Sequence, residues 1–134
     1  MTAEARLVPQ IEAEVRASFA KQGLMTSFGA SITTLAPGRC TITLPYSEAV
    51  GQQHGFFHGG IIGAVGDTAG GYAALTVLPS GSEVLTLEYK INFLRPAAGA
   101  LLMARRHCAR PCSRASCRRR KHRSRAIVGR LRTT

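Results

Sequence analysis

The stretch from His58 to Leu78 constrains the fold more than any other part of the sequence. From Ile61 onward it contains no Lys or Arg, and its single carboxylate, Asp67, lies near the middle. The pattern predicts a helix even though the stretch is rich in glycine, which costs about 1 kcal/mol per residue relative to alanine. Because small or apolar side chains cover most of its circumference, we expect the rest of the domain to enclose this helix closely. A central carboxylate among glycines also argues against a membrane span.

Sequence patterns on either side of this helix indicate a β-sheet. Alternating residues predict a hairpin of two strands, Ala30–Leu35 and Cys40–Leu44, around a Pro-Gly turn. The clearest strand pattern runs from Leu85 to Phe93, where apolar residues alternate with polar ones. Another strand begins at Leu101–Met103.

The N-terminal part of the chain has the pattern of an amphipathic helix, from about Pro9 to Gln22, with Gly23 as its C-terminal stop. A chain of 134 residues is long enough for one domain with a single two-layer core. We therefore expect residues 1–134 to form one α+β domain, in which a curved antiparallel β-sheet wraps around the long central α-helix.

The net charge of +11 is unevenly distributed along the chain. Residues 1–103 contain six Lys or Arg and seven acidic residues, which gives −1, whereas residues 104–134 contain twelve basic residues and no acid, which gives +12. Residues 1–22 have no continuous apolar stretch, so the pattern predicts no secretory signal and a cytoplasmic protein without a membrane partner. Four cysteines in such a protein do not indicate a disulfide framework.

The segment from Arg105 to Arg125 is atypical because it combines many basic residues with almost no large apolar ones, so we expect it not to fill strand positions. The interpretation we favour is a local reading-frame change in a GC-rich gene, followed by a compensating shift before the strand-like Ala126–Leu131. A second is a basic tail that binds nucleic acid or an anionic surface. A third is a metal site, although the spacing of its candidate ligands matches no standard zinc pattern; these are His107, Cys108, Cys112, Cys117 and His122.

Residues at the start of the central helix and within it are candidates for catalysis. A helix N-terminus has free N–H groups and a partial positive charge, so Gly59 and Gly60 could form an oxyanion hole. Asp67 lies eight residues beyond Gly59, about 12 Å along the helix. Both can act on one carbonyl only if they come from different subunits, which predicts a dimer with shared sites. Alternatively, Asp67 bonds to a neighbouring strand, His58 caps the helix, and the glycines only allow close packing.

Two motifs resemble those of a known family: His58-Gly59-Gly60 with Asp67 nine residues after the histidine, and the run from Glu88 to Pro96. In these motifs, between about residues 44 and 99, the chain resembles the phenylacetate-degradation type of acyl-CoA thioesterase, which has the hotdog fold. The resemblance implies hydrolysis of a small aromatic or medium-chain acyl-CoA to the free acid and CoA. It implies Asp67 as general base or as the nucleophile that forms an anhydride, Gly59 N–H as the group that polarises the thioester carbonyl, and His58 as support for the thioester end.

The same resemblance implies further site residues. Gln52 would contact the water or the thioester, and Thr86 would place a hydroxyl near the acyl group or the water. Gly60 would lie at the substrate, and Phe57 would line the acyl pocket or pack in the core. Arg95 would approach a CoA phosphate or remain a solvated strand-end residue.

The family uses no metal or redox cofactor, since CoA is part of the substrate, and its members form dimers that often pair into tetramers. The spacing of the first motif fits a thioesterase better than a hotdog dehydratase. The alternative function is a non-catalytic acyl-CoA-binding hotdog domain with a basic tail that contacts nucleic acid. The sequence identifies neither the acyl group nor the choice between dimer and tetramer.

Overall fold

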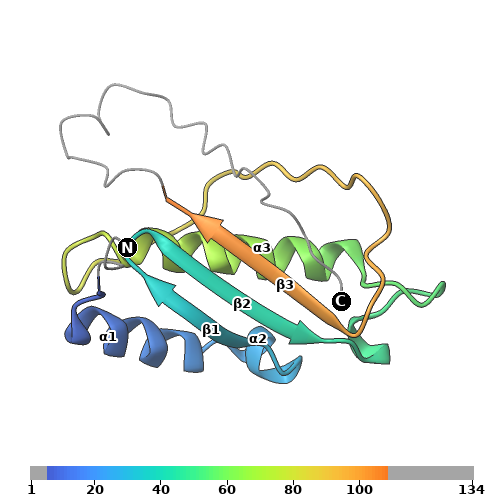
Figure 1. Cartoon of the computed structure of the whole chain (residues 1–134), viewed down its shortest axis with the longest axis horizontal. Helices are drawn as coiled ribbons and strands as arrows, with labels where there is room; N and C mark the ends of the chain where they lie inside the picture. Colours follow the sequence, from blue (N-terminus) through green and yellow to red (C-terminus); the bar gives the residue numbers. More distant parts are fainter. Residues whose placement is uncertain (1–5, 109–134) are drawn as a thin grey trace, which may run out of the picture.

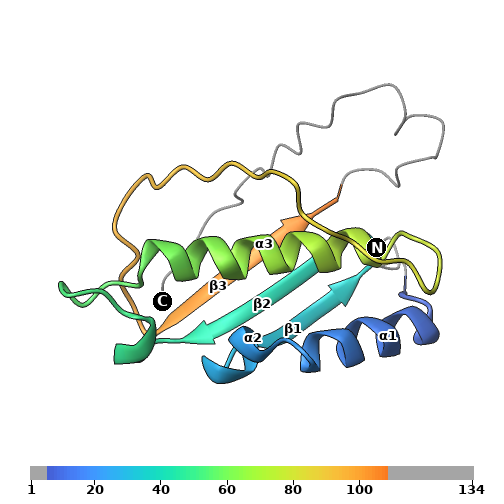
Figure 2. The same ribbon diagram turned by 180° about the vertical axis from the view of Figure 1, so that it is seen from behind.

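The computed structural model describes residues 6–108, in which an antiparallel sheet packs against one long helix. The sheet has the strand order β1-β2-β3, and α3 lies across one of its faces, as two opposite views show (Figures 1 and 2). The elements in chain order are α1 (Pro9–Ala20), α2 (Gly23–Ser27), β1 (Ser31–Ala36), β2 (Arg39–Pro45), the 3-10 helix η1 (Glu48–Val50), α3 (Gly59–Leu75) and β3 (Leu101–His107).

Helix α1 begins at the predicted proline but ends at Ala20, two residues earlier than expected. The prediction that Gly23 stops the helical region is wrong, because Gly23 begins the short helix α2. The break lies at Gln22, whose extended backbone conformation separates the two helices. Met25 of α2 is only 1% exposed, so burial of its side chain holds this turn of helix against the core.

The predicted hairpin is confirmed as β1 and β2, which pair from Ser31–Thr43 to Ala36–Arg39 with an irregularity near Thr33. Gly38 in the turn has a positive φ of 72°, a conformation that favours glycine. A Cβ at Gly38 would lie 2.7 Å from the carbonyl oxygen of Cys108, so the close approach also requires glycine. Backbone N–H of Gly38 donates to the Thr76 hydroxyl over 2.8 Å, which joins the hairpin turn to the C-terminus of α3.

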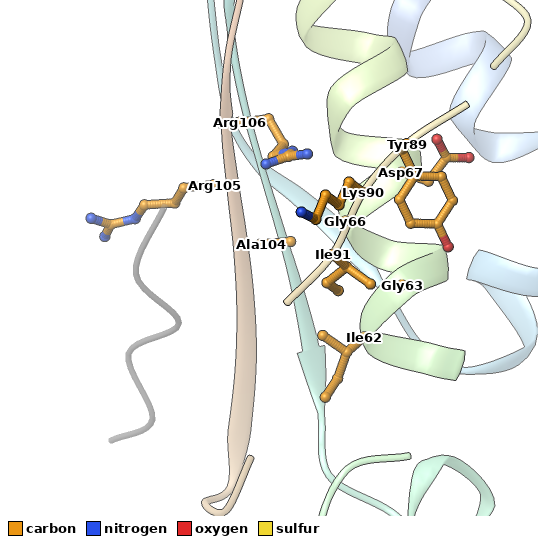
Figure 3. Close-up of a pocket in the computed structure, with 10 residues that line it drawn as sticks. All are labelled: Ile62, Gly63, Gly66, Asp67, Tyr89, Lys90, Ile91, Ala104, Arg105 and Arg106. Carbon is orange, nitrogen blue, oxygen red and sulfur yellow. The ribbon is translucent and has the colours of Figure 1, made fainter. Parts of the chain in front are cut away.

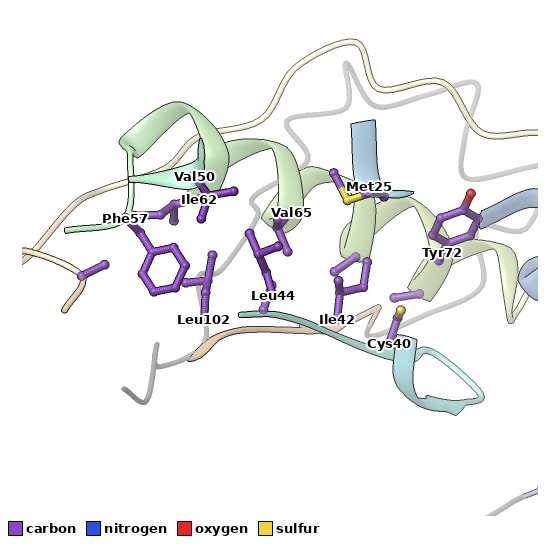
Figure 4. Close-up of a cluster of buried hydrophobic side chains, with 14 of the residues drawn as sticks. Met25, Cys40, Ile42, Leu44, Val50, Phe57, Ile62, Val65, Tyr72 and Leu102 are labelled. Atoms are coloured by element: carbon purple, nitrogen blue, oxygen red, sulfur yellow. The ribbon is translucent and has the colours of Figure 1, made fainter. Parts of the chain in front are cut away.

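The core lies between the sheet and α3, with β2 as its central strand (Figure 4). Alternate residues of β2 point into it, and Cys40, Ile42 and Leu44 are completely buried. Val65 of α3 and Leu102 of β3 pack against them, each 1% exposed. The expectation of an enclosed central helix is confirmed on this face of α3.

The predicted strand Leu85–Phe93 forms no strand within the described chain, so this prediction is wrong for a single chain in isolation. Within residues 6–108, the backbone of residues 83–95 makes no hydrogen bond to other backbone groups. Alternation of apolar and polar residues gives a strand two unlike faces, but a strand also requires hydrogen bonds to a neighbouring strand that is distant in sequence. Instead, the segment arches past α3 from the end of the helix to the start of β3 (Figure 1).

The prediction that the segment from Arg105 on forms no strand is also wrong for its first three residues. Arg105, Arg106 and His107 continue β3, and the strand pairs with β2 along its length. Alternation explains this, because Arg105 and His107 are exposed while Arg106 is half-buried. The remainder of the atypical segment, from residue 109 on, lies outside the described residues, and with it lie three of the five predicted metal ligands, Cys112, Cys117 and His122.

Residues 6–108 lack two further features. No helix in this part of the chain is both long and apolar enough to cross a membrane. No group of three or more His, Cys, Asp or Glu side chains in the same part is arranged to hold a metal ion.

Candidate active site

Asp67 is the only charged residue of α3, and its side chain is held from outside the helix. The hydroxyl of Thr86 donates a hydrogen bond to Oδ1 of Asp67 over 2.8 Å. Asp67 is half-buried, whereas Thr86 belongs to the exposed segment after the helix. The bond orients the carboxylate and leaves Oδ2 without a hydrogen-bond donor within the described chain. The structure thus brings together two residues that the sequence assigns to one site.

Two hollows meet at Asp67. The smaller one has a volume of about 30 Å³ and lies between α3, residues 89–91 and β3 (Figure 3). The larger one has a volume of about 680 Å³ and is bordered by α1, the second half of α3 and residues 82–86. The larger volume is within the range of small-molecule binding sites, so a ligand beside Asp67 has room there.

A cation faces the smaller hollow from β3. Arg106 points toward α3, while the neighbouring Arg105 points away from it (Figure 3). A Cβ at Gly70 would lie 3.8 Å from Nε of Arg106, so the guanidinium lies against the helical turn that starts at Asp67. Burial lowers the pKa of Arg106, and the negative charge of Asp67 opposes this shift. Arg106 therefore adds positive potential near the carboxylate.

His58 caps the N-terminus of α3. Its Nδ1 accepts a hydrogen bond from the N–H of Gly60 over 3.0 Å, and its own N–H donates to the carbonyl of Val50 over 2.9 Å. The N-cap interpretation of His58 is therefore confirmed. Gly60 N–H is occupied by this cap, so the expectation that Gly60 serves as an oxyanion donor does not fit the structure.

Gly59 offers a backbone donor at this end of the helix. Its N–H has no hydrogen-bond acceptor within residues 6–108. A Cβ at Gly59 would lie 3.4 Å from the ring of Phe93, so glycine allows the aromatic side chain to lie directly on the helix end. A free N–H at a helix N-terminus is suited to polarise a carbonyl oxygen.

Of the other predicted site residues, Gln52 and Phe57 make structural contacts within a single chain. The side-chain oxygen of Gln52 accepts a hydrogen bond from the backbone N–H of His54, which stabilises the loop before α3. Phe57 is 3% exposed and packs edge-on against Tyr46, with ring centroids 5.2 Å apart, so the structure favours core packing. Arg95 is exposed.

Catalytic candidates on α3 therefore form two separate groups. Asp67 and Thr86 lie in the middle of the helix, and His58 and Gly59 lie at its N-terminus. Eight residues of helix separate Gly59 from Asp67, about 12 Å at 1.5 Å per residue. One chain does not bring the two groups together.

Sequence reasoning missed Arg106 and the polar end of the larger hollow. Arg106 lies in the segment that the sequence analysis described only by its composition. It is two positions after the buried Ala104 and so lies on the same face of β3, which the alternation along the strand indicates. At the polar end, Gln22 donates to the Tyr72 hydroxyl over 3.0 Å, and Ser18 lies 3.2 Å from the same oxygen. These contacts join α1 to α3 and have no local sequence signature.

Comparisons with known proteins concern the family and the fold of the chain. The sequence model of the thioesterase superfamily matches residues 54–111 of this chain. A thioesterase family protein of Silicibacter pomeroyi is 46% identical, and the structural match has a TM-score of 0.73 and covers 75% of this chain and 74% of that one. The PaaI protein of E. coli, from the phenylacetic acid degradation operon, is 23% identical to this chain. Its structural match has a TM-score of 0.65 and covers 74% of this chain and 70% of that one. At this identity the match shows similarity of fold alone.

A curated relative provides a third comparison. A Halobacterium salinarum protein with a provisional esterase name is 35% identical over 85 residues, which are 60% of this chain and 56% of that protein. The chain spans about half the length of the curated relatives it matches.

Proposed function

Because this chain belongs to the thioesterase superfamily and has its hotdog fold, we propose that it hydrolyses the thioester of a small aromatic or medium-chain acyl-CoA to the free acid and CoA. The observation that carries the proposal is the Asp67 carboxylate. It is oriented by the Thr86 hydroxyl and lies beside a hollow large enough for an acyl group.

Asp67 has two possible roles in this reaction. As a general base, its free oxygen removes a proton from water while the water oxygen attacks the thioester carbon; the C–S bond then breaks, and the thiolate of CoA takes the proton. As a nucleophile, Asp67 attacks the same carbon, the C–S bond breaks, and the CoA thiolate leaves as a mixed anhydride forms. Water then hydrolyses the anhydride to the free acid and the Asp67 carboxylate, and the proton released goes to the CoA thiolate. The hydrogen bond from Thr86 orients the carboxylate in either case.

The carbonyl oxygen of the thioester would be held at the N-terminus of α3. The N–H of Gly59 donates to this oxygen, and the partial positive charge of the helix end stabilises the negative charge that develops there. His58 contributes by fixing the first turn of the helix through Gly60. The proposed reaction uses no metal or redox cofactor, and CoA enters as part of the substrate.

The site is composed of two chains in this proposal. The distance of about 12 Å along α3 prevents Gly59 and Asp67 of one chain from acting on the same carbonyl. A homodimer, alone or paired into a tetramer, supplies Asp67 from one subunit and Gly59 from the other. Gln52 and Arg95 are then expected to contact the thioester and the CoA phosphates across the interface.

The test is release of CoA thiol by the purified full chain over a panel of aromatic and aliphatic acyl-CoA substrates. We expect Asp67→Asn to reduce turnover by roughly a thousandfold or more with unchanged unfolding behaviour. The matched control Glu12→Gln removes a carboxylate from a surface ion pair with Arg16 and should retain full activity. Equal activity of D67N and the original chain would contradict the proposal. Binding of acyl-CoA without any hydrolysis would favour the non-catalytic alternative.

A further inference from the structure

The face of the sheet that points away from α3 carries a cluster of basic side chains. The residues of β2 that alternate with its buried core side chains point to this face, and Arg39 is among them. On β3, Arg105 points away from α3 (Figure 3), and His107 lies two residues further along the same face. All three side chains are exposed. We call Arg39, Arg105 and His107 the outer basic cluster.

The strand register brings the outer basic cluster together. Arg39 is directly opposite His107, and Arg105 is opposite Thr41. Arg39 and Arg105 are therefore diagonal neighbours on one face, about 7–8 Å apart. Nε of Arg105 donates a hydrogen bond to Sδ of Met103 over 3.1 Å, which holds the guanidinium against the sheet. Residues far apart in the sequence thus form one positively charged surface.

The three strands supply no negative charge to this surface, because their sequences contain neither Asp nor Glu. Like charges at neighbouring positions of a sheet destabilise it, so an anion bound beside the cluster would relieve the repulsion. Thr41 also pairs with Thr34, which places hydroxyl groups on the same face as the arginines. Arginine and threonine side chains are common donors to phosphate oxygens. The surface therefore suits a partner that carries phosphates.

The sequence that follows the sheet extends the positive charge. Of the twelve basic residues in 104–134, Arg105 and Arg106 belong to β3, and the other ten come after Cys108, the last residue that the structure describes. The same stretch contains no acid. A single phosphate neutralises only part of this charge, whereas a polymer with closely spaced phosphates can follow it from the sheet onward.

We propose that the outer basic cluster binds the phosphate backbone of double-stranded nucleic acid, with Arg39 and Arg105 each contacting a phosphate. The three strands contain no aromatic residue, so this face offers no platform on which the bases of a single strand could stack. Membrane anchors combine basic residues with exposed large apolar ones, and the exposed large apolar residues of the described chain all lie outside the strands.

Two properties of this binding follow from the geometry. Contacts to phosphate carry no sequence information directly, so the affinity is independent of base sequence. The binding is also independent of the proposed function, because the candidate active site lies on α3 at the other face of the sheet (Figures 1 and 2).

The salt dependence of binding tests the proposal. Fluorescence anisotropy of a short labelled DNA duplex, titrated with the full chain at several salt concentrations, gives the slope of log K against log salt concentration. Each phosphate contact contributes about −0.9 to this slope. The double variant R39Q/R105Q should therefore have a slope less steep by about two, with roughly tenfold or more weaker binding at physiological salt.

Two control variants separate the cluster from net charge and from folding. R16Q/K21Q removes the same two charges from exposed positions outside the sheet and should keep the original slope. R39K/R105K keeps both charges on the face and should also keep most of the slope.

The proposal is supported if the affinity is equal for duplexes of unrelated sequence and the slope changes in R39Q/R105Q alone. It is overturned if R39Q/R105Q and R16Q/K21Q behave alike, since binding would then follow net charge or the chain beyond the sheet. Loss of the slope in R39K/R105K, tighter binding of the single strand than of the duplex, or binding to phosphatidylserine vesicles without binding to DNA would overturn it as well.

Discussion

The hydroxyl of Thr86 donates a hydrogen bond to Asp67 over 2.8 Å and so joins an exposed segment to the single charge of the central helix. The two residues are 19 positions apart, and their bond is the main polar contact that the segment makes with α3 near the candidate site. The geometry of the carboxylate thus depends on a residue outside the core.

Loss of the Thr86 hydroxyl should therefore affect catalysis more than stability. A hydrogen bond to a charged group contributes about 1.5–3 kcal/mol, so we expect Thr86→Val to lower kcat by roughly ten- to a hundredfold. Thr86→Ser keeps a hydroxyl and should retain most of the activity. Since Thr86 is exposed, both variants should unfold at the same denaturant concentration as the original chain. Steady-state kinetics with the best acyl-CoA substrate check the first expectation, and equal kcat for both variants would contradict it.

The cap at the start of α3 should be measurable as stability. His58→Ala removes the acceptor for Gly60 N–H, and loss of an N-cap costs about 1 kcal/mol. His58→Asn supplies another acceptor and should recover most of the free energy of unfolding in urea. The exposed His54 provides the control, and His54→Ala should change this free energy little. A fully stable H58A would show that the cap contributes nothing.

Two glycines of α3 should respond differently to alanine. A Cβ at Gly66 meets no atom within 4 Å, so Gly66→Ala should raise the free energy of unfolding by about 0.5–1 kcal/mol. A Cβ at Gly63 would lie 2.8 Å from the Tyr89 hydroxyl, so Gly63→Ala must displace Tyr89. We expect faster proteolysis of residues 83–95 in G63A than in G66A, and equal cleavage rates would argue against the contact.

Cys40 should be chemically inert and should make stability depend on alkaline pH. Burial raises the pKa of its thiol from the ordinary 9.0 to about 12. At pH 8 the buried thiol should resist iodoacetamide, whereas the half-buried Cys108 should react faster; peptide mapping by mass spectrometry distinguishes them.

The sign of the pH effect follows from the raised pKa. Above pH 9 the unfolded chain loses the Cys40 proton while the folded chain retains it up to about pH 12. Unfolding therefore becomes more favourable as pH rises through this window, by about 1.4 kcal/mol per pH unit from this group. Cys40→Ala removes the contribution, so the difference in unfolding free energy between the two proteins should narrow from pH 8 to pH 11. A constant difference would show that Cys40 titrates normally.

The unusual composition after Arg105 allows a separate test at the level of the gene. The superfamily match ends at residue 111, within the predicted atypical segment. The reading-frame hypothesis stays a prediction, and translation of the gene in its two other frames checks it. Strand-like sequence similar to thioesterases in one of those frames would support the hypothesis, and its absence from both would refute it.

Local patterns predicted the elements that local forces determine. The hairpin follows from alternation and a turn that requires glycine at Gly38, and α3 follows from a glycine-rich apolar run that begins at a capping residue. The family motif predicted Asp67 as the catalytic carboxylate. The resemblance implied a Thr86 hydroxyl near the acyl group or the water, but its bond to Asp67 was not predicted, since no local rule joins residues 19 apart.

Features that depend on distant partners escaped prediction. The Leu85–Phe93 run has the alternation of a strand, but no other part of the described chain pairs with it. Conversely, Arg105 and Arg106 have poor strand composition, yet β2 supplies a complete ladder for them. The cap formed by His58 also removes Gly60 from the candidate donors, which spacing alone did not indicate.

Placement of Gly59 and Asp67 at two levels of one rigid helix has a genetic consequence. If each active site takes one residue from each subunit, a chain damaged at Asp67 and a chain damaged at Gly59 complement one another. A hybrid dimer of the two contains one site with both lesions and one site with none. Two inactive alleles expressed in the same cell would therefore restore activity that neither provides alone. Complementation of this kind follows because α3 of each chain contributes one residue to each of two different active sites.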